Sequence, residues 1–128
     1  MKEEFRHPKI YSDLVVFYKI YWQIHQGMPR PFRFTTGEQI LSLLSRGLQM
    51  IVRVNLMDKT SAHQCDLAAE ILADLSAALE CCRGLLTLGW YLKMLSDGAL
   101  LQLNDRLDAL GRQAASWRQW FIRQNLSA

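Results

Sequence analysis

The stretch from Leu103 to Phe121 reads LNDRLDALGRQAASWRQWF, and it decides the fold. Apolar residues recur along it at alternating steps of four and three, at Leu103, Leu107, Leu110, Ala114, Trp117 and Phe121. This spacing places all of them on one face of an α-helix, while charged and polar residues occupy the opposite side. The stretch is therefore predicted to form one wall of a helical bundle.

The composition of the whole chain agrees with a helical protein. Half of its 128 residues are hydrophobic, which is enough for a core in a single domain of residues 1–128. Proline is rare, Leu and Ala are abundant, and β-branched residues are few. We therefore expect an all-α fold, an antiparallel up-and-down four-helix bundle.

Turn and capping signals divide the chain into four helices. The first helix is predicted to start near residue 11 or 12 and to end at Gln26, before Gly27. Residues 27–34 contain two prolines two residues apart, so this segment cannot be helical throughout and is expected to be an extended or turning linker.

Two capping boxes and one loop signal mark the other three helices. The sequence Thr35-Thr36-Gly37-Glu38 predicts the start of a second helix that ends at about Met57. The similar sequence Ser61-Ala62-His63-Gln64 opens a third helix, expected to continue to about Leu95. Ser96-Asp97-Gly98 then marks a break and the N-cap of the fourth.

No residue pattern indicates catalysis or metal binding. His63 and Cys65 together with Cys81 and Cys82 lack the spacing of a zinc site, and Cys82 falls on the apolar line of the third helix. The chain has no nucleophile, phosphate-loop or dinucleotide motif. We expect no enzyme activity, no cofactor, no metal and no small-molecule substrate.

The cysteines and the N-terminus indicate a cytoplasmic protein. Three cysteines, two of them adjacent, make a disulfide framework improbable. The first residues, Met1 to Arg6, are charged and contain no apolar signal region. The longest uncharged apolar run, Gly84 to Leu92, is about half of the roughly 20 residues that a membrane span needs.

The basic residues leave two partner classes open. The net charge is only +3, but basic residues outnumber acids in residues 1–34 and acids outnumber basic residues in residues 60–96. Most of the cations are arginines, which form forked contacts with phosphate or carboxylate. Each one alone fits a solvated face or an intrahelical pair, such as Asp108 with Arg112. As a set, the arginines suit either a nucleic acid or an acidic protein.

The tryptophans and surplus apolar residues predict self-association. Trp117 lies on the apolar stripe and is expected to pack in the core. Trp120 lies beside the centre of the stripe, and we predict that it anchors a subunit interface together with Arg118 and Arg123. Further apolar residues exceed what one bundle core covers, which is an association signal: Leu41, Leu48, Val52, Trp120 and Ile122.

Several short sequences are placed along the chain as in a known family. They occur in the linker and the start of the second helix, near the end of that helix, and in the fourth helix: Met28-Pro29-Arg30, Phe34-Thr35-Thr36-Gly37, Asn55, Leu110-Gly111-Arg112-Gln113 and Ser116-Trp117. With them, residues 10–123 resemble the Avd-like four-helix-bundle family. This family contains the accessory variability determinants of diversity-generating retroelements and related proteins encoded in ribosomal-RNA intervening sequences.

The resemblance implies an assembly and a function. It implies a barrel-like homopentamer with a basic surface that has no catalytic activity, binds the retroelement's reverse transcriptase and its template RNA or complementary DNA, and supports error-prone copying. By position, Arg83, Arg112 and Lys93 match places where the family tends to be basic. Arg30 and Arg33 in the linker complete the candidates for binding nucleic acid or reverse transcriptase.

The chain also departs from the family pattern. It is only mildly basic, Thr87 stands one turn after Arg83 where a second cation would strengthen a patch, and no lysine-rich tail follows Asn125. The alternative is therefore an intervening-sequence-type protein, a self-assembling structural or interaction module that does not bind nucleic acid. An enzyme with an unfamiliar site is the least favoured alternative.

Overall fold

Four long helices and one short helix make up the computed structural model, which describes residues 8–127 and side chains as far as Gln124. The bounds are α1 (Lys9–Gln26), α2 (Arg30–Arg33), α3 (Thr36–Asn55), α4 (Ala62–Tyr91) and α5 (Asp97–Ser127). No strand occurs among residues 8–127. The prediction of an all-α chain with four main helices is confirmed.

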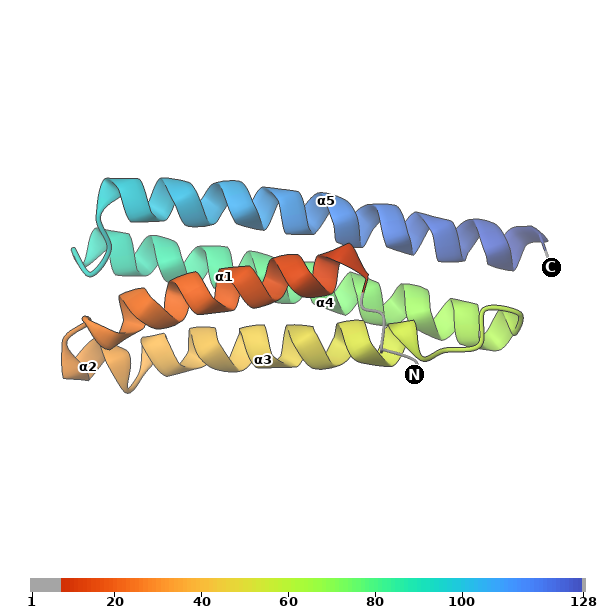
Figure 1. Cartoon of the computed structure of the whole chain (residues 1–128), viewed down its shortest axis with the longest axis horizontal. Helices are drawn as coiled ribbons and strands as arrows, with labels where there is room; N and C mark the ends of the chain where they lie inside the picture. The colour runs from red at the N-terminus through yellow and green to blue at the C-terminus, as the bar shows by residue number, and fades with distance from the viewer. Residues whose placement is uncertain (1–7, 128) are drawn as a thin grey trace, which may run out of the picture.

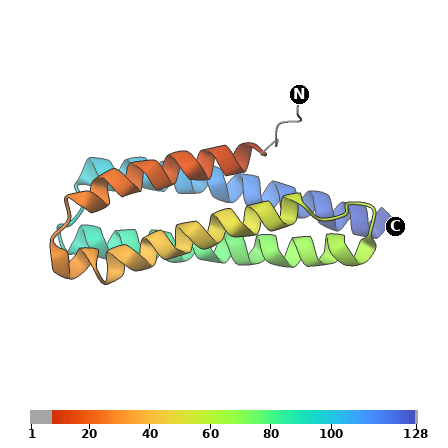
Figure 2. The ribbon, with the colours of Figure 1, turned by 60° about the horizontal axis from the view of Figure 1, so that its bottom comes forward.

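The long helices run alternately up and down. Figure 1 shows α1 lying between α3 and α5, and α4 packs against both α3 and α5. The order around the bundle is therefore α1, α3, α4, α5, as the turned view in Figure 2 also shows. The α2 helix and the α4–α5 connection lie together at one end, here called the α2 end. The α3–α4 connection and the end of α5 lie at the other, here called the C-terminal end.

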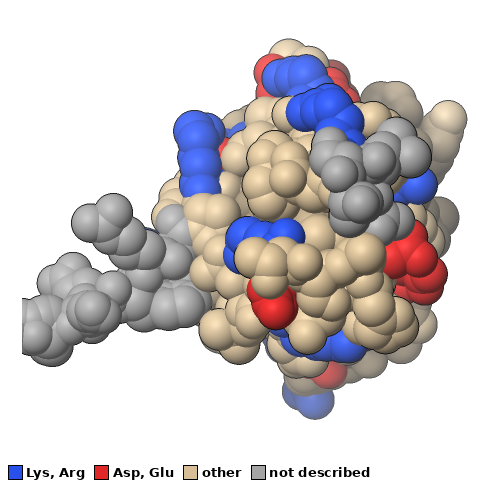
Figure 3. Space-filling view, turned by 90° about the vertical axis from the view of Figure 1, so that its right-hand side faces the viewer, with Lys and Arg blue, Asp and Glu red and all other residues tan. Residues whose placement is uncertain are grey.

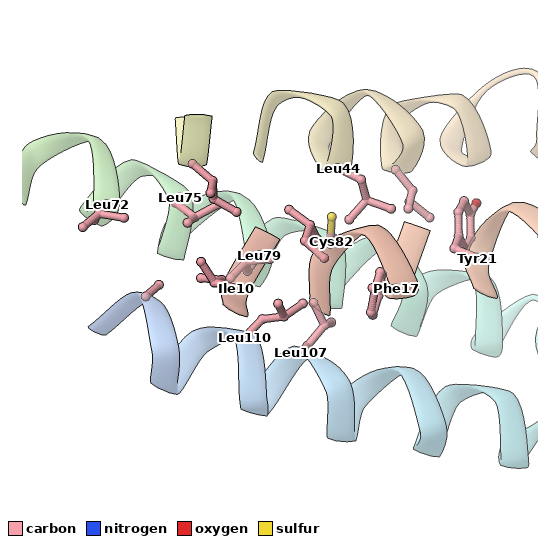
Figure 4. Packing of buried hydrophobic residues seen from close by; sticks show 14 of the residues in the cluster. Ile10, Phe17, Tyr21, Leu44, Leu72, Leu75, Leu79, Cys82, Leu107 and Leu110 are labelled. Carbon is pink, nitrogen blue, oxygen red and sulfur yellow. The ribbon is translucent and has the colours of Figure 1, made fainter. Parts of the chain in front are cut away.

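The apolar stripe of α5 faces the core, as its spacing predicts. All of its members are buried except Trp117, which is half-buried and packs against the core cluster. Figure 4 shows Leu107 and Leu110 pointing toward side chains from the other helices, including Phe17 of α1 and Cys82 of α4. Cys82 is only 1% exposed and acts as a small core residue, as predicted. None of the helices in the described part of the chain is long and apolar enough to cross a bilayer.

The first helix begins two or three residues before its predicted start and ends where predicted. Pro8 is extended, and its carbonyl accepts a 3.0 Å bond from Tyr11 N. The added turn carries Ile10 into the core, where it is 3% exposed. Ile10 was not part of the apolar spacing from which the start of the helix was predicted.

The predicted linker contains one helical turn. Pro31 lies in the first turn of α2, where a missing N–H leaves no helix bond unmade, so proline is tolerated. Phe32 of this turn is buried against α4 because Gly89 has no side chain. A Cβ at Gly89 would lie 3.1 Å from Cζ of Phe32 and 3.4 Å from Cδ1 of Leu95. The linker prediction thus missed a turn that tertiary packing stabilises.

The predicted capping box at Thr35 is wrong, whereas the other two caps form. The Thr35 hydroxyl donates backward to the carbonyl of Pro31 at 2.5 Å and does not cap α3. Ser61 Oγ accepts from Gln64 N at 3.2 Å, which confirms the start of α4. The carbonyl oxygen of the Gln64 side chain accepts from Asp58 N at 2.7 Å instead of completing the box. Ser96 Oγ accepts from the α5 backbone, as predicted.

The α4 helix ends four residues before its predicted end. Lys93 has a left-handed backbone with φ 65°, and its N–H donates to the carbonyl of Trp90 at 2.9 Å. Met94 N donates to the carbonyl of Gly89 at 2.8 Å, so the two bonds close the helix in a C-terminal capping motif. The turn brings Leu95 back onto the core at 5% exposure. Burial of Leu95 therefore decides the helix end.

The exposed apolar residues differ from those predicted. Leu41, Leu48, Val52, Trp120 and Ile122 are all half-buried. The large apolar residues that are exposed lie mostly toward the α2 end: Trp22, Phe34, Leu88, Tyr91, Leu92 and Leu101. The helical pattern did not select any of these exposed residues.

Candidate functional site

Two of the predicted binding arginines lie over one aromatic ring at the α2 end. The guanidinium carbons of Arg30 and Arg33 are 5.3 Å and 5.0 Å from the centroid of the Phe34 ring. Such cation–π contacts hold a guanidinium without removing its charge. Arg33 Nη1 also donates to the carbonyl of Gln26 at 3.2 Å, and Phe34 is 55% exposed. The turn therefore presents two oriented cations at the surface.

A buried histidine fixes this turn onto α1. His25 is 5% exposed, and its Nε2 lies 3.1 Å from the carbonyl oxygen of Arg33. A carbonyl only accepts, so Nε2 carries the proton and donates. The start of α3 lies close by, because a Cβ at Gly37 would be 2.9 Å from Cδ2 of His25. His25 is not among the residues selected from the sequence. Its position four residues after buried Tyr21 is the signal for burial.

Tyr21 joins α1 to the same corner. Its hydroxyl donates to the carbonyl of Gly37 at 3.3 Å. Burial raises the pKa of the Tyr21 hydroxyl well above its ordinary value, and the nearby Cys82 thiol adds to this shift. The hydroxyl therefore remains a neutral donor at physiological pH. These bonds hold α2, and with it Arg30 and Arg33, against the bundle.

Lys93 also lies at the α2 end, beside a surface depression. The depression is lined by Trp90, Tyr91, Lys93, Leu95, Ser96 and Asp97. Trp90 Nε1 donates to Asp97 Oδ1 at 2.7 Å, which ties the end of α4 to the start of α5. Tyr91 is 70% exposed, so its ring is open to a partner. The structure thus brings Lys93 to the same end as Arg30 and Arg33.

Arg83 and Arg112 lie elsewhere, on the face shared by α4 and α5. Arg83 is ten residues before Lys93, or about 15 Å along the helix at 1.5 Å per residue. Arg112 lies on α5, one turn after Asp108, and is exposed. The predicted binding residues therefore form two separate groups and no single patch.

Arg83 is occupied by two carboxylates. Its Nη2 donates to Asp108 Oδ1 at 2.7 Å and its Nε to Glu80 Oε1 at 3.2 Å. Burial alone lowers the pKa of Arg83, but the bonds to Asp108 and Glu80 outweigh it and raise that pKa. The predicted pair of Asp108 with Arg112 is wrong, because Asp108 reaches across to α4 instead. Within the described part of the chain Arg112 forms no ion pair, so it presents its charge more freely than Arg83.

The predicted interface tryptophan lines a groove at the C-terminal end. Trp120 meets the ring of Phe121 edge to face at 5.0 Å and is half-buried. The groove is lined by Ile10, Lys59, Gln113, Ser116, Trp117, Trp120 and Arg123. Arg118 is half-buried, does not line the groove, and its Nε makes no hydrogen bond with the described residues. The structure therefore brings Trp120 and Arg123 to one feature and separates Arg118 from them.

Charges of both signs are interspersed at this C-terminal end. Figure 3 looks onto it and shows separate basic and acidic side chains around a broad uncharged surface. A wide, uniformly basic surface is the usual electrostatic signature of a nucleic-acid site. The visible part of this end carries none.

Two of the three cysteines, Cys65 and Cys82, are buried. Burial raises the pKa of the Cys82 thiol to about 12, with a smaller effect from Cys81. Cys65 Sγ donates to the carbonyl of Lys59 at 3.4 Å. Among the residues whose placement is described, no group of three or more His, Cys, Asp or Glu is arranged to hold a metal ion.

Comparisons with family models, curated proteins and solved structures found no match. The geometry of the chain therefore carries the functional interpretation. The α2 end, with Arg30, Arg33, Phe34, Tyr91 and Lys93, is the best-formed candidate surface in the described structure.

Proposed function

We propose that the protein is a non-enzymatic accessory protein of a diversity-generating retroelement. In this role it binds the reverse transcriptase and the template RNA or its complementary DNA and supports mutagenic copying. The observation that carries the proposal is the pair of guanidiniums held over Phe34 at the α2 end, with Lys93 and exposed Tyr91 at the same end. The resemblance in sequence supplies the biological setting.

Binding would be electrostatic, with aromatic support. Guanidinium N–H groups of Arg30 and Arg33 suit the oxygens of phosphates, and Lys93 adds a point charge. The exposed Tyr91 ring suits stacking by an unpaired base. Phosphate contacts release counterions, so affinity for RNA should fall steeply as salt rises.

The proposal includes assembly into a homopentamer. The groove with Trp120 and the half-buried apolar residues on α3 and α5 support self-association, because a lone bundle leaves them partly in water. Light scattering on the purified chain should give a mass of about five chains. If Trp120→Ala leaves the mass unchanged, Trp120 is not an interface anchor.

One observation favours the alternative, a self-assembling module that does not bind nucleic acid. Arg83, matched to the family's basic positions, is neutralised by Asp108 and Glu80. A module of this kind would form the same oligomer but purify without RNA. Binding of a labelled structured RNA therefore separates the two functions.

The decisive experiment compares two double variants that remove equal charge. Arg30→Ala with Arg33→Ala should weaken RNA binding and reduce the salt slope by about two, since each phosphate contact contributes about 0.9. Arg46→Ala with Arg53→Ala removes two exposed arginines of α3 and should have a much smaller effect. Equal losses in both variants would contradict a site at the α2 end.

A pull-down tests the protein partner separately. The wild-type chain should retain the reverse transcriptase of a diversity-generating retroelement, and retention should weaken with added salt. Loss of RNA binding with unchanged retention would place the two partners on different surfaces. If neither RNA nor reverse transcriptase is retained, the accessory function is wrong.

A further inference from the structure

Three rings lie in near-parallel planes along α1 as this helix approaches the α2 end (Figure 1). The rings of Tyr18 and Trp22 have centroids 6.3 Å apart and planes 18° from parallel. Those of Trp22 and His25 are 6.4 Å apart, also at 18°. Tyr18 is half-buried and His25 is buried, whereas Trp22 is 44% exposed. The two neighbouring rings therefore orient a large aromatic ring that is accessible from solvent.

This series of rings is connected to the arginines of α2. His25 Nε2 donates to the carbonyl of Arg33 at 3.1 Å. The Arg33 guanidinium donates to the carbonyl of Gln26, which is four residues after Trp22, or about 6 Å along the helix. The same guanidinium lies over the exposed ring of Phe34. An exposed tryptophan, an oriented cation and a second exposed ring thus follow one another from α1 onto α2.

The segment that carries these groups is positively charged. No acid occurs between Asp13 and Glu38, and this segment contains three Lys or Arg residues: Lys19, Arg30 and Arg33. None of the three forms an ion pair with the described residues. Lys19 is exposed and lies three residues before Trp22, a spacing that makes the two side chains neighbours on the helix surface. The segment therefore suits an anionic partner.

We propose that Trp22 is a stacking site for an unpaired base, and that the surface formed by Trp22, Arg33 and Phe34 binds single-stranded nucleic acid in preference to duplex. Stacking on an aromatic ring accepts any base, while cations beside the ring bind the phosphates. A base inside a duplex is stacked between its neighbours and has no free face for the ring. This inference rests on the proposed function, because it concerns the nucleic acid bound at the α2 end.

The rings favour a nucleic-acid strand over an acidic peptide. Carboxylates of a peptide would use the arginines and leave the faces of the aromatic rings without a matching group. Each nucleotide instead brings one phosphate and one flat ring, which matches the sequence of Trp22, Arg33 and Phe34 along the surface. Stacking and phosphate contacts do not read the 2′-hydroxyl, so single-stranded RNA and DNA should bind alike.

Fluorescence anisotropy with matched probes tests the stacking site. The probes are a labelled RNA of about 12 nucleotides without self-complementarity, the DNA of the same sequence, and both strands annealed to their complements. The wild-type chain should bind both single strands several-fold more tightly than the duplexes. Trp22→Leu keeps an apolar side chain but removes the ring, and should weaken single-strand binding about five-fold or more. Duplex binding and the salt slope should not change, since no charge is lost.

Two further variants control for indirect effects. Trp22→Phe keeps an aromatic ring and should retain most of the single-strand affinity, which a general loss of structure would not allow. Trp120→Leu makes the same substitution at a half-buried tryptophan of the C-terminal end. It should leave the ratio of single-strand to duplex affinity at the wild-type value, even if assembly changes.

The outcomes separate this proposal from the proposed function. Equal affinity of wild type for single strand and duplex, or equal losses for both in Trp22→Leu, would overturn the stacking site while RNA binding itself stands. Binding of neither probe would overturn the stacking site together with the RNA-binding part of the proposed function. A polyglutamate peptide of the same charge that competes as well as the single strand would assign the surface to an acidic protein and also overturn the proposal.

Discussion

Asp108 of α5 accepts a 2.7 Å hydrogen bond from Nη2 of Arg83 on α4. The two residues are 25 positions apart, and Glu80 holds Nε of the same guanidinium at 3.2 Å. Arg83, which matches a position where the family tends to be basic, thus also links α4 to α5. Its availability to phosphate depends on these acids, which leads to the first prediction.

Asp108→Asn should strengthen binding of RNA. The amide can still accept from Arg83 but no longer neutralises it, so one more cation is available to phosphate. Under the proposed function, affinity for a structured RNA at low salt should rise a few-fold, and the salt slope should steepen by up to about one. Stability should fall by less than about 1 kcal/mol, because the pair is partly exposed.

Asp105→Asn is the matched control for this prediction. It removes the same charge from an exposed residue of the same helix that forms no ion pair with Arg83. Filter binding over a salt series should show a smaller effect. Equal effects would mean that net charge alone, and not release of Arg83, sets the affinity.

Lys93→Gly should stabilise the protein. Residue 93 has φ 65°, a conformation that glycine adopts without strain and that costs a side chain with a Cβ. We expect a gain of up to about 1 kcal/mol in the free energy of unfolding by urea titration. Lys93→Ala removes the same charge but keeps the strained Cβ, so it should bring no gain. A destabilised Lys93→Gly would argue against the left-handed turn at the end of α4.

Two glycine substitutions should act in opposite directions. A Cβ at Gly37 would lie 2.9 Å from Cδ2 and 3.0 Å from Nε2 of His25, so Gly37→Ala should cost about 1–3 kcal/mol. Gly84 is exposed inside α4 with no neighbouring atom within 4 Å of its ideal Cβ. Gly84→Ala should therefore stabilise by up to about 1 kcal/mol through helix propensity. Thermal unfolding of both variants and of wild type tests this: the melting temperature should fall for Gly37→Ala and rise for Gly84→Ala.

Asp13 should make stability depend on pH in the acid range. Hydrogen bonds from Lys9 at 2.6 Å and Gln113 at 2.7 Å lower the pKa of the Asp13 carboxyl in the folded state. Its contribution is therefore fully present above the unfolded-state pKa of about 4 and is lost as pH falls through the lowered folded-state value. This contribution of Asp13 to the free energy of unfolding is about 1 kcal/mol or less, since the side chain is 34% exposed.

Urea titrations at neutral pH and near pH 3 test this contribution. Asp13→Asn should be less stable than wild type at neutral pH, and the difference should shrink in acid. Asp58→Asn changes another carboxyl whose pKa is lowered, by bonds from Thr60, outside the α1–α5 contact. If the stability difference between wild type and Asp13→Asn instead grows in acid, the predicted direction of the pH dependence is wrong.

The cysteines should differ sharply in reactivity. Burial raises the pKa of Cys82 to about 12, so almost no thiolate forms there near pH 8, and the side chain is 1% exposed. Cys81, its neighbour, is exposed. Iodoacetamide should modify Cys81 in the folded protein and reach Cys82 only after unfolding in urea, as peptide mapping would show. Equal labelling in the native state would contradict the placement of Cys82 in the core.

The candidate site could be predicted only in part. The spacing of residues along a helix shows which face of that helix they share, but not which other helix that face contacts. The sequence selected Arg30, Arg33 and Lys93 as cations, and it contains no sign that α2 and the end of α4 meet. Phe32 brings them together by packing at Gly89 near Leu95, which are more than 50 residues further along the chain. Similarly, the pairing of Asp108 with Arg83 depends on how α4 and α5 align, so the local rule of four-residue spacing chose the wrong partner.

The sequence by itself determined which elements form and which sides they bury. The stripe from Leu103 to Phe121, the caps at Ser61 and Ser96 and the core position of Cys82 follow from helical periodicity and local hydrogen bonding, which act within a few residues. Only the tertiary structure decided the turn at residues 30–33, the end of α4 at Tyr91 and the groove beside Trp120. These features depend on relative helix lengths and on contacts between distant residues, and a one-dimensional pattern does not contain that information.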